Sequence, residues 1–374
     1  MEKQVISPMS MDSGSVTAIK AEPDHRAQAA PVSRARPETE MNSASTELGL
    51  GGLLDMARAG LRSQILYAAN SLGIFPMLSQ QPHSARELAE KTSLDELAIE
   101  RLLDACVALG LARKRNGCYE NSTTAETHLV PDRPGYIGDA VDMFRWRVAP
   151  RWNDLQASLR QRRPANMYDE LLAQPEQFER FLVALRQLAV WRARALALRL
   201  DFLPFRRLLD LGAGSGVYSA EILKRNPSLR AYLFDQPRVC EILRRLMAEA
   251  GLSERVEVIA GDFFCDELPP ADLVLFSNVL HDFPVEHVKR LLGRAFGALE
   301  PGGTVLINDF ILEDSKTAPV DGTLMSLVLF LETDGAGNYS AQEYSDWLAA
   351  AGFRETEVVT LHETERIVRA RKPA

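Results

Sequence analysis

Cysteine is scarce in this sequence, and its spacing does not suit a metal site. The 374 residues contain only Cys106, Cys118, Cys240 and Cys265, with no Cys-x-x-Cys pair and no histidine pairing nearby. A structural zinc is therefore not expected, and the pattern predicts reduced thiols in a cytoplasmic protein.

Long apolar runs and an excess of positive charge are also missing. No apolar run approaches the ~18 residues of a membrane-spanning helix, so no membrane span is expected. The first residues, MEKQVISPMSMDSG, lack the apolar stretch of a secretory signal. The net charge of -8 argues against a protein that binds nucleic acid through phosphate contacts. With 46% apolar and 25% charged residues, the chain has the composition of a soluble globular protein of about two domains.

Residues 1–46 are rich in Ser, Pro, Ala, Glu and Arg and show no apolar periodicity. Such a segment cannot bury enough apolar surface to offset the entropy lost on ordering. We therefore predict that residues 1–46 form a disordered tail.

Residues 47–200 are predicted to form a mainly helical domain with a winged-helix arrangement. Apolar residues from Leu54 to Leu72 recur at helical spacing, which predicts either a core helix or a subunit interface. Capping-box patterns at Ser84–Glu87 and Ser93–Glu96 open two further helices. Asn116-Gly117 then joins two short strands, which completes the order helix, helix, hairpin.

A winged helix raises a second hypothesis, a transcription regulator. The helix that would enter a DNA groove carries acidic side chains between residues 95 and 104 against a single Arg101. That is the wrong sign for a surface that binds phosphate, and the basic segment 113–115 is short enough to be a solvated turn. We expect a structural or dimerising domain and no nucleic-acid partner.

Residues 139–200 are predicted to be helices joined by short loops, and they hold many of the aromatic residues of the chain. These aromatic residues either belong to the core or line an apolar pocket, and we expect some of each. Phe144 and Phe178 are the candidates for the pocket.

From residue 201 onward, apolar runs alternate with helical patterns, which predicts an α/β domain at 201–374. The expected strands are 207–212, 229–235, 255–260, 271–277 and 303–309, followed by an edge hairpin at 357–361 and 366–371. Alternation of this kind gives a Rossmann-like sheet, here of seven strands, with helices on both faces.

A glycine-rich stretch follows the first of these strands and reads Leu-Leu-Asp210-Leu-Gly212-Ala-Gly214-Ser-Gly216. Glycine lets the backbone approach a ligand closely, and the helix that follows offers free N–H groups to an anion. Nicotinamide and flavin sites read G-x-G-x-x-G, whereas G-x-G-x-G after an acid resembles motif I of class I S-adenosylmethionine (SAM) methyltransferases. Asp235 ends the second strand, where an acid can bind ribose hydroxyls.

Residues that follow the other strands are further candidates, because ligands of open α/β sheets bind at the carboxyl ends of strands. Asp262 can accept a hydrogen bond from an adenine amino group, and Phe263 and Phe283 can cover the same base. The structural alternatives are a helix N-cap for Asp262 and a core position for Phe283. His281 follows the fourth strand with an ordinary pKa of ~6.5, which suits a general base. Asp309 ends the next strand and is placed to orient the imidazole.

The chain resembles the family of small-molecule O-methyltransferases that includes plant caffeate-type and bacterial antibiotic-tailoring enzymes. The resemblance covers residues 48–374, and its motifs are LLDLGAGSG, FDQP at 234–237, GDFF at 261–264, NVLHDF at 278–283 and LEPGGTVLINDF at 299–310. It implies a homodimer formed through the helical domain, SAM as the cofactor and no metal. It also implies that His281 is the base and that Asp309 replaces a more usual Glu.

Further residues are assigned from the resemblance, and two of them depart from the family pattern. Gln236 and Ser277 join the cofactor site, although plant members carry Lys at the position of Ser277. Asn278 and Met325 join Phe144 and Phe178 around the substrate. Asn338 occupies the place of a second acid that commonly flanks the base, so Asp309 is expected to orient His281 alone.

The sequence therefore predicts a SAM-dependent O-methyltransferase that modifies a hydroxyl of a small, neutral aromatic or polyketide-like molecule. Two alternatives stay open. The first is a C- or N-methyltransferase, or a SAM-holding enzyme of other chemistry, on the same scaffold. The second is a non-catalytic winged-helix regulator that senses SAM.

Overall fold

The computed structural model describes residues 48–161, 167–362 and 365–374, so the tail predicted at 1–46 lies outside it. Residues 54–374 form one compact unit, and residues 48–53 belong to the preceding unit. Within residues 54–374 the helical part and the large sheet have separate hydrophobic cores. The domain boundary predicted near residue 200 stays a prediction.

The N-terminal part confirms the predicted order of helix, helix and hairpin. Its small sheet is antiparallel, with strand order β1-β3-β2. Its elements are α1 (Leu50–Ser71), α2 (Ile74–Gln80), β1 (His83–Ser84), α3 (Ala85–Thr92), α4 (Glu96–Ala108), β2 (Ala112–Arg115), β3 (Cys118–Asn121) and α5 (Thr123–His128).

The two predicted capping boxes had different outcomes. Ser84 caps α3 as expected, since its side chain accepts from the N–H of Glu87 and the Glu87 side chain accepts from the N–H of Ser84. The second box at Ser93–Glu96 was wrong. Asp95 caps α4 by accepting from the N–H of Ala98 at 3.0 Å, because Ser93 ends α3 in the left-handed region with φ 56°.

The described residues between 138 and 199 form a series of helices, in agreement with the prediction for 139–200. The elements are α6 (Gly138–Met143), a π-helix (Phe144–Val148), α7 (Ala149–Asn153), α8 (Leu155–Gln161), α9 (Met167–Leu172) and α10 (Pro175–Arg199). A π-helical turn inside an α-helix is rare and is frequent at functional sites. Here it begins at Phe144, one of the predicted pocket residues.

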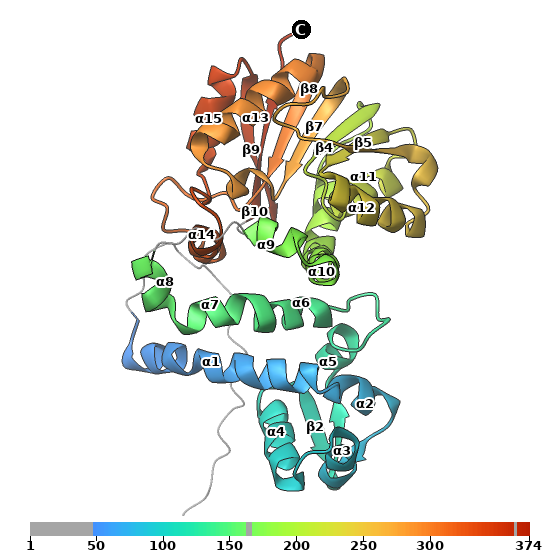
Figure 1. The fold of residues 1–374 in the computed structure, drawn as a ribbon, viewed down its shortest axis with the longest axis vertical. Coiled ribbons are helices and arrows are strands. Elements are labelled where there is room, and N and C mark those ends of the chain that lie inside the picture. The colour runs from blue at the N-terminus through green and yellow to red at the C-terminus, as the bar shows by residue number, and fades with distance from the viewer. Residues whose placement is uncertain (1–47, 162–166, 363–364) are drawn as a thin grey trace, which may run out of the picture. The chain divides into compact units, whose positions relative to one another are not determined.

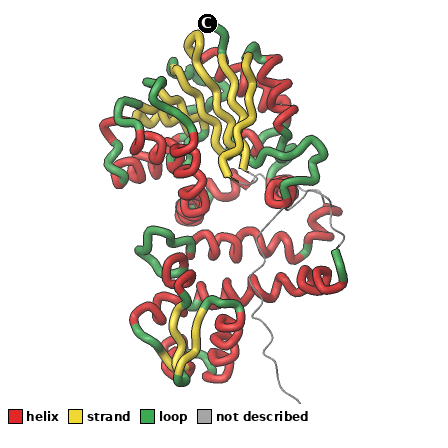
Figure 2. Tube along the Cα trace, turned by 180° about the vertical axis from the view of Figure 1, so that it is seen from behind, coloured by secondary structure: helices red, strands yellow, loops and turns green. Residues whose placement is uncertain are grey.

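The C-terminal part contains a seven-stranded sheet with the order β6-β5-β4-β7-β8-β10-β9. Figures 1 and 2 show this sheet from opposite sides. The five strands from β4 to β8 are parallel, and β10 pairs antiparallel with β8 and β9. The strands are β4 (Arg207–Leu211), β5 (Arg230–Asp235), β6 (Val256–Ala260), β7 (Ala271–Ser277), β8 (Leu299–Asn308), β9 (Arg354–His362) and β10 (Glu365–Arg371). This confirms the predicted α/β sheet, and β8 starts earlier than expected.

Helices cover both faces of this sheet (Figure 1). Successive residues of a strand point to opposite faces, so Leu208 packs with α10, α11 and α12, while Leu209 packs with α13 and α15. The covering helices that follow α10 are α11 (Val217–Arg225), α12 (Pro237–Glu249), α13 (Val285–Ala298) and α15 (Ala341–Ala350), whereas the described residues of the two sheet cores include none from α14 (Val320–Glu332). Short 3-10 turns lie at Ser253–Arg255 and Leu280–Asp282.

Candidate functional site

The sheet topology creates a crevice at the carboxyl end of β4. The chain runs outward from β4 to β5 and β6 on one side, and it returns to β7 and β8 on the other side. Ligands of open α/β sheets bind at such a reversal of strand order. The turn 212–216, Asp235, Asp262, His281 and Asp309 all follow these parallel strands, so the topology brings them to one edge of the sheet.

The glycine-rich turn needs glycine at each of its three positions. Gly212, Gly214 and Gly216 have φ values of 77°, 55° and 68°, which side chains with a Cβ rarely adopt. A Cβ at Gly216 would lie 2.6 Å from Leu243, so close packing also requires glycine there. A Cβ at Gly214 would meet nothing within 4 Å. The backbone of Gly214 therefore faces open space, as a turn that cradles a ligand requires.

Two acids lie beside this turn, of which Asp210 is buried and Asp235 is half-buried. Asp235 accepts hydrogen bonds from the N–H groups of Gly214 and Gln236, both at 2.7 Å. Burial raises the pKa of Asp235 to about 6, although the two N–H groups act in the opposite direction. Asp210 is 2% exposed and accepts from Ser219 Oγ at 2.5 Å. Burial raises the pKa of Asp210 to about 7.

These groups fit a ligand that carries hydroxyl and amino donors. The second carboxylate oxygen of Asp210 is buried and has no hydrogen-bond partner among the residues described. A buried acceptor without a partner is costly unless a ligand or water supplies a donor. With the open side of Gly214, the turn has the room and the acceptors that the methionine and ribose parts of SAM require.

The residues predicted to bind the adenine of SAM follow β6 and β7. Asp262 is exposed, and its side chain accepts from the N–H of Phe264 at 2.8 Å, which leaves one carboxylate oxygen for a ligand. The rings of Phe263, Phe264 and Phe283 form an edge-to-face cluster with centroids 5.0 to 5.8 Å apart. Gln236 is exposed at the start of α12. The contacts of these residues with adenine stay predictions.

His281 and Asp309 are brought together, as the sequence suggested. The Nδ1–H of His281 donates to Asp309 Oδ1, and the backbone N–H of His281 donates to Asp309 Oδ2 at 3.2 Å. The histidine is 7% exposed, and the Asp309 side chain is 2% exposed. Because Nδ1 is held by Asp309, Nε2 is the nitrogen left to exchange a proton with a substrate.

Two opposing effects set the pKa of His281. Burial lowers it, whereas the charges of Asp309 and Asp282 and the hydrogen bond to Asp309 raise it, and the result is a pKa of about 9. Asp282 Oδ1 lies 3.6 Å from His281 Nε2. A base of this strength matches a phenol with a pKa of ~10 better than free imidazole does.

We expect kcat/KM to rise with pH until His281 is neutral, that is up to about pH 9. Neutral imidazole is the basic form, so below that pH the rate should rise about tenfold per pH unit. The Asp309→Asn variant loses the charge that raises the pKa and keeps the burial that lowers it. Its rising limb should therefore move to lower pH, while its plateau falls. Rates measured from pH 6 to 10 test this, and an unmoved limb would contradict it.

The positions that depart from the family pattern have structural partners of their own. Asn338 is 5% exposed, and its Nδ2 donates to the carbonyl oxygen of Gly322 at 2.7 Å. The loop reaches the base through Gly337, whose N–H donates to the carbonyl oxygen of His281 at 2.9 Å. Ser277 accepts from Asn308 Nδ2 at 3.3 Å. Asn338 thus ties the loop to α14.

The predicted substrate residues lie in different surroundings. Phe178 is fully buried in a cluster of α6, α9, α10 and α12, and Phe144 packs against the same cluster. Met325 is half-buried on α14. Asn278 donates to Tyr218 Oη at 3.0 Å and lines a cavity of about 140 Å³ with Asp309. Substrate contact stays a prediction for all four residues.

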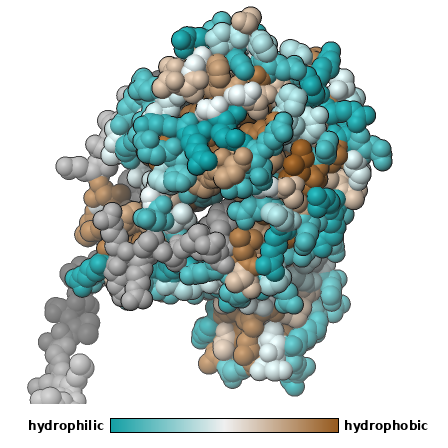
Figure 3. Space-filling view, turned by 45° about the horizontal axis from the view of Figure 1, so that its top comes forward, coloured by the Kyte–Doolittle hydropathy of each residue, from teal (hydrophilic) through white to brown (hydrophobic). Residues whose placement is uncertain are grey.

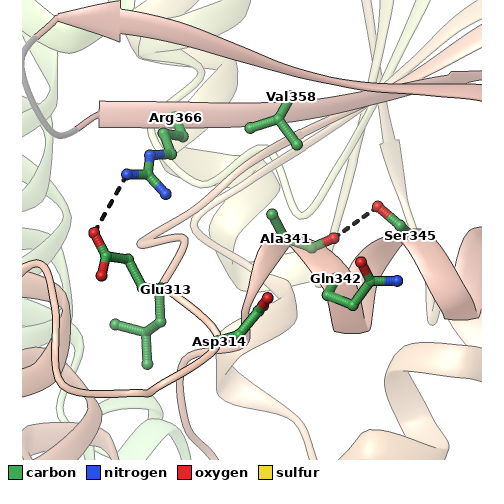
Figure 4. Close-up of a pocket in the computed structure, with 8 residues that line it drawn as sticks. Glu313, Asp314, Ala341, Gln342, Ser345, Val358 and Arg366 are labelled. Carbon is green, nitrogen blue, oxygen red and sulfur yellow. Dashed lines mark hydrogen bonds and ion pairs between the residues drawn. The ribbon is translucent and has the colours of Figure 1, made fainter.

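A second, more open hollow of about 290 Å³ lies between Leu312–Asp314, the start of α15 and strands β9 and β10. In Figure 4 Glu313 and Arg366 face each other across it, 3.6 Å apart. None of the predicted site residues lines this hollow. Within the ranges that the structure describes, no group of three His, Cys, Asp or Glu side chains is placed to hold a metal ion.

The sequence did not reveal two groups near the base. Tyr344 on α15 donates through Oη to Asp309 Oδ2 at 3.3 Å. Glu332 at the end of α14 is 3% exposed, pairs with Arg147 of the π-helix, and interacts with Asp282. Tyr344 lies at a position that helical spacing assigns to the core, and Glu332 and Arg147 are far apart in the chain. The sequence alone carries no signal for either contact.

The doubly wound sheet, its glycine-rich turn and the acids at the carboxyl ends of β4 and β5 define a class I SAM-dependent methyltransferase. Comparison with known proteins narrows this class to one family. Residues 152–354 match the O-methyltransferase domain family, and residues 54–131 match the O-methyltransferase dimerisation domain. The chain belongs to the O-methyltransferase family and is a SAM-dependent enzyme.

Two named O-methyltransferases and one solved methyltransferase structure are similar to this chain over most of its length. The chain is 36% identical to 3-hydroxy-5-methyl-1-naphthoate 3-O-methyltransferase of Streptomyces sahachiroi, over 82% of this chain and 90% of that protein. It is 31% identical to the tetracenomycin polyketide synthesis 8-O-methyl transferase TcmO of Streptomyces glaucescens, over 87% and 97% of the two chains. Human N-acetylserotonin methyltransferase, solved in complex with SAM, superposes with a TM-score of 0.80 at 25% identity, over 89% of this chain and all of that chain.

Proposed function

We propose that the enzyme methylates a hydroxyl group of a small, neutral aromatic or polyketide-like molecule, with His281 as the general base. The buried His281–Asp309 pair at the carboxyl ends of β7 and β8 carries this proposal. The two Streptomyces relatives, named as a naphthoate and a tetracenomycin O-methyltransferase, support the class of acceptor.

In this mechanism the turn 212–216 and Asp235 would hold the methionine and ribose parts of SAM, and Asp262 with the phenylalanines beside it would hold the adenine. SAM, when bound, supplies a methyl group activated by the sulfonium. His281 Nε2 takes the proton of the acceptor hydroxyl as the oxygen becomes nucleophilic. Asp309 keeps Nδ1 protonated and stabilises the imidazolium. Such a base contributes roughly 10²- to 10⁴-fold to a rate.

A panel of phenols, hydroxyquinones and hydroxynaphthoates tests the acceptor class. The enzyme is incubated with SAM and each compound, and both S-adenosylhomocysteine and the product mass are measured. We expect a gain of one methyl group on at least one hydroxylated aromatic. Methylation confined to amine or carbon acceptors would favour an N- or C-methyltransferase. A change of substrate without release of S-adenosylhomocysteine would indicate other chemistry on the scaffold.

We also propose a homodimer that uses α1. The surface in Figure 3 is mostly polar, with apolar side chains gathered in patches. Several apolar side chains of α1 are exposed, among them Met56 (63%) and Leu61 (66%), and Ala69 is the one fully buried residue of this helix in the described chain. A helix with so many exposed apolar residues is expected to be covered by a partner. The matched dimerisation domain begins at residue 54, within α1.

The Met56→Glu/Leu61→Glu variant should therefore elute as a monomer, at half the mass of the wild type. Two charges placed in an apolar interface are not compensated, which disfavours association. Light scattering coupled to size-exclusion chromatography measures the mass. Leu198→Glu is the matched control, because Leu198 on α10 is equally exposed at 62%. A dimeric Met56→Glu/Leu61→Glu variant would contradict the assignment of α1.

The ion pairs of the small β2–β3 hairpin argue against the regulator hypothesis. Lys114 of the small hairpin lies 2.8 Å from Asp104 and 3.6 Å from Glu100 of α4. Arg115 lies 3.3 Å from Glu120. Two of the three basic residues of the segment 113–115 are thus paired with acids, which supports the absence of a nucleic-acid partner. A cytoplasmic location stays a prediction, and no described helix is long and apolar enough to cross a bilayer.

A further inference from the structure

Asp309, the partner of the proposed base, is held by four hydrogen bonds. Oδ1 accepts from His281 Nδ1 and from the N–H of Phe310, the latter at 2.9 Å. Oδ2 accepts from the N–H of His281 at 3.2 Å and from Tyr344 Oη at 3.3 Å. Three of these donors belong to His281 and Phe310, which follow β7 and β8. The fourth belongs to Tyr344, which lies on α15.

Tyr344 is fixed in place by its surroundings. It is fully buried in the core of the sheet domain. Its ring lies edge-on to Tyr339 and Trp347, with centroids 5.8 Å and 5.6 Å away. The first turn of α15 is capped by Ser340, whose side chain accepts from the N–H of Glu343. A buried hydroxyl needs a hydrogen-bond partner, and here that partner is the carboxylate of Asp309.

We propose that Tyr344 is a positioning residue of the reaction, which orients Asp309 and tunes its charge so that His281 works as a base. This inference rests on the proposed role of His281. The Tyr344 Oη–H donates to Asp309 Oδ2 and draws negative charge away from Oδ1, which faces the imidazole. Without that donor, more charge acts on the imidazole, and the protonated form of His281 becomes more stable.

A Tyr344→Phe variant removes no other ionisable group near this pair, and such groups include Arg192, Asp321, Glu365 and Arg366, which line the cavity beside Asp309. Asp282 follows His281 in the chain and lies 3.6 Å from Nε2. Glu332 at the end of α14 interacts with Asp282, and Tyr339 precedes α15. A change in the titration of His281 can therefore be assigned to the lost hydroxyl.

The test is the titration of His281 by NMR of its ring nitrogens in the full-length protein, which needs no acceptor. In Tyr344→Phe we expect the pKa of His281 to rise by about 0.5 to 1 unit. Tyr119→Phe is the matched control, because Tyr119 is 1% exposed and its Oη donates to Asp104 at 2.7 Å, far from the site in the sequence. An unchanged or lowered pKa in Tyr344→Phe, or an equal rise in Tyr119→Phe, would overturn the proposal.

A kinetic experiment distinguishes a failure of this inference from a failure of the proposed function. At pH 7 the expected shift lowers kcat/KM about three- to tenfold in Tyr344→Phe, and the loss should disappear as the pH rises toward 10. In an Asp309→Asn background the same substitution should have no further effect, because the hydroxyl acts through Asp309. Additive losses in the double variant would overturn the proposal. If the wild type methylates no hydroxyl, the proposed function fails, and the NMR titration still decides the role of Tyr344.

Discussion

The His281→Ala variant is expected to transfer the methyl group about 10²- to 10⁴-fold more slowly than the wild type. A phenol with a pKa of ~10 is mostly neutral at pH 7, so without a base the oxygen is a poor nucleophile. The affinity for SAM should stay within about twofold, because the hydrogen bond between Gly214 and Asp235 does not involve His281. Single-turnover rates with SAM bound in advance, together with calorimetric SAM titrations, measure the two effects separately.

His128→Ala is a suitable control for this experiment. His128 is half-buried in the N-terminal part, and its Nδ1 bonds to the carbonyl oxygen of Gly135 at 2.8 Å. The control should keep the wild-type rate. If His281→Ala lost SAM affinity as strongly as rate, the residue would be part of the cofactor site, and its role as a base would be wrong.

The Asp235→Ala variant should lose SAM affinity by about 10- to 100-fold or more. A hydrogen bond to a charged group is worth about 1.5 to 3 kcal/mol, and a carboxylate at the end of β5 is placed to accept from ribose hydroxyls. The pKa of about 6 adds a pH dependence. Asp235 binds as the carboxylate, so the affinity for SAM should fall as the pH drops through 6 and should level off above it.

Asp272→Ala is the matched control for Asp235. Asp272 accepts from two backbone N–H groups as Asp235 does, those of Arg206 at 2.8 Å and Arg207 at 2.9 Å. It lies at the start of β7, at the opposite end of the sheet from the proposed site. Both variants should lose similar stability, and only Asp235→Ala should lose affinity. Equal affinities in the two variants would remove Asp235 from the cofactor site.

The parallel sheet and the edge that carries the site were predictable from the sequence. Each parallel strand is an apolar run with a chemically distinct residue at or just beyond its end, such as Asp210 near the end of β4 or His281 after β7. Parallel strands share one carboxyl edge, so the order of runs along the chain was enough to group these residues. Which strands are neighbours follows from packing, so the sequence could name Asp309 only as a candidate partner of His281, because it ends the next strand along the chain.

Other features required the three-dimensional structure. Ser93-Leu-Asp-Glu96 satisfies the capping-box pattern, yet the preceding helix ends at Ser93 and Asp95 takes over as the cap. Local patterns of this kind do not record where a neighbouring element stops. Tyr344 resembles any core aromatic residue on a helix, and only the packing of α15 brings its hydroxyl to Asp309. Which side chains of α10 and α14 face the substrate pocket also depends on packing, so the sequence alone did not predict the lining of that pocket.

The central claim is that His281 removes the hydroxyl proton during methyl transfer, and one measurement tests it most directly. The ratio of wild-type to His281→Ala rates is determined at one pH for derivatives of an accepted phenol whose hydroxyl pKa values range from above 10 to below the assay pH. We predict a large ratio for the weakly acidic phenols and a ratio near one for those already ionised. A ratio that stays constant across the series would show that His281 does not act as the base.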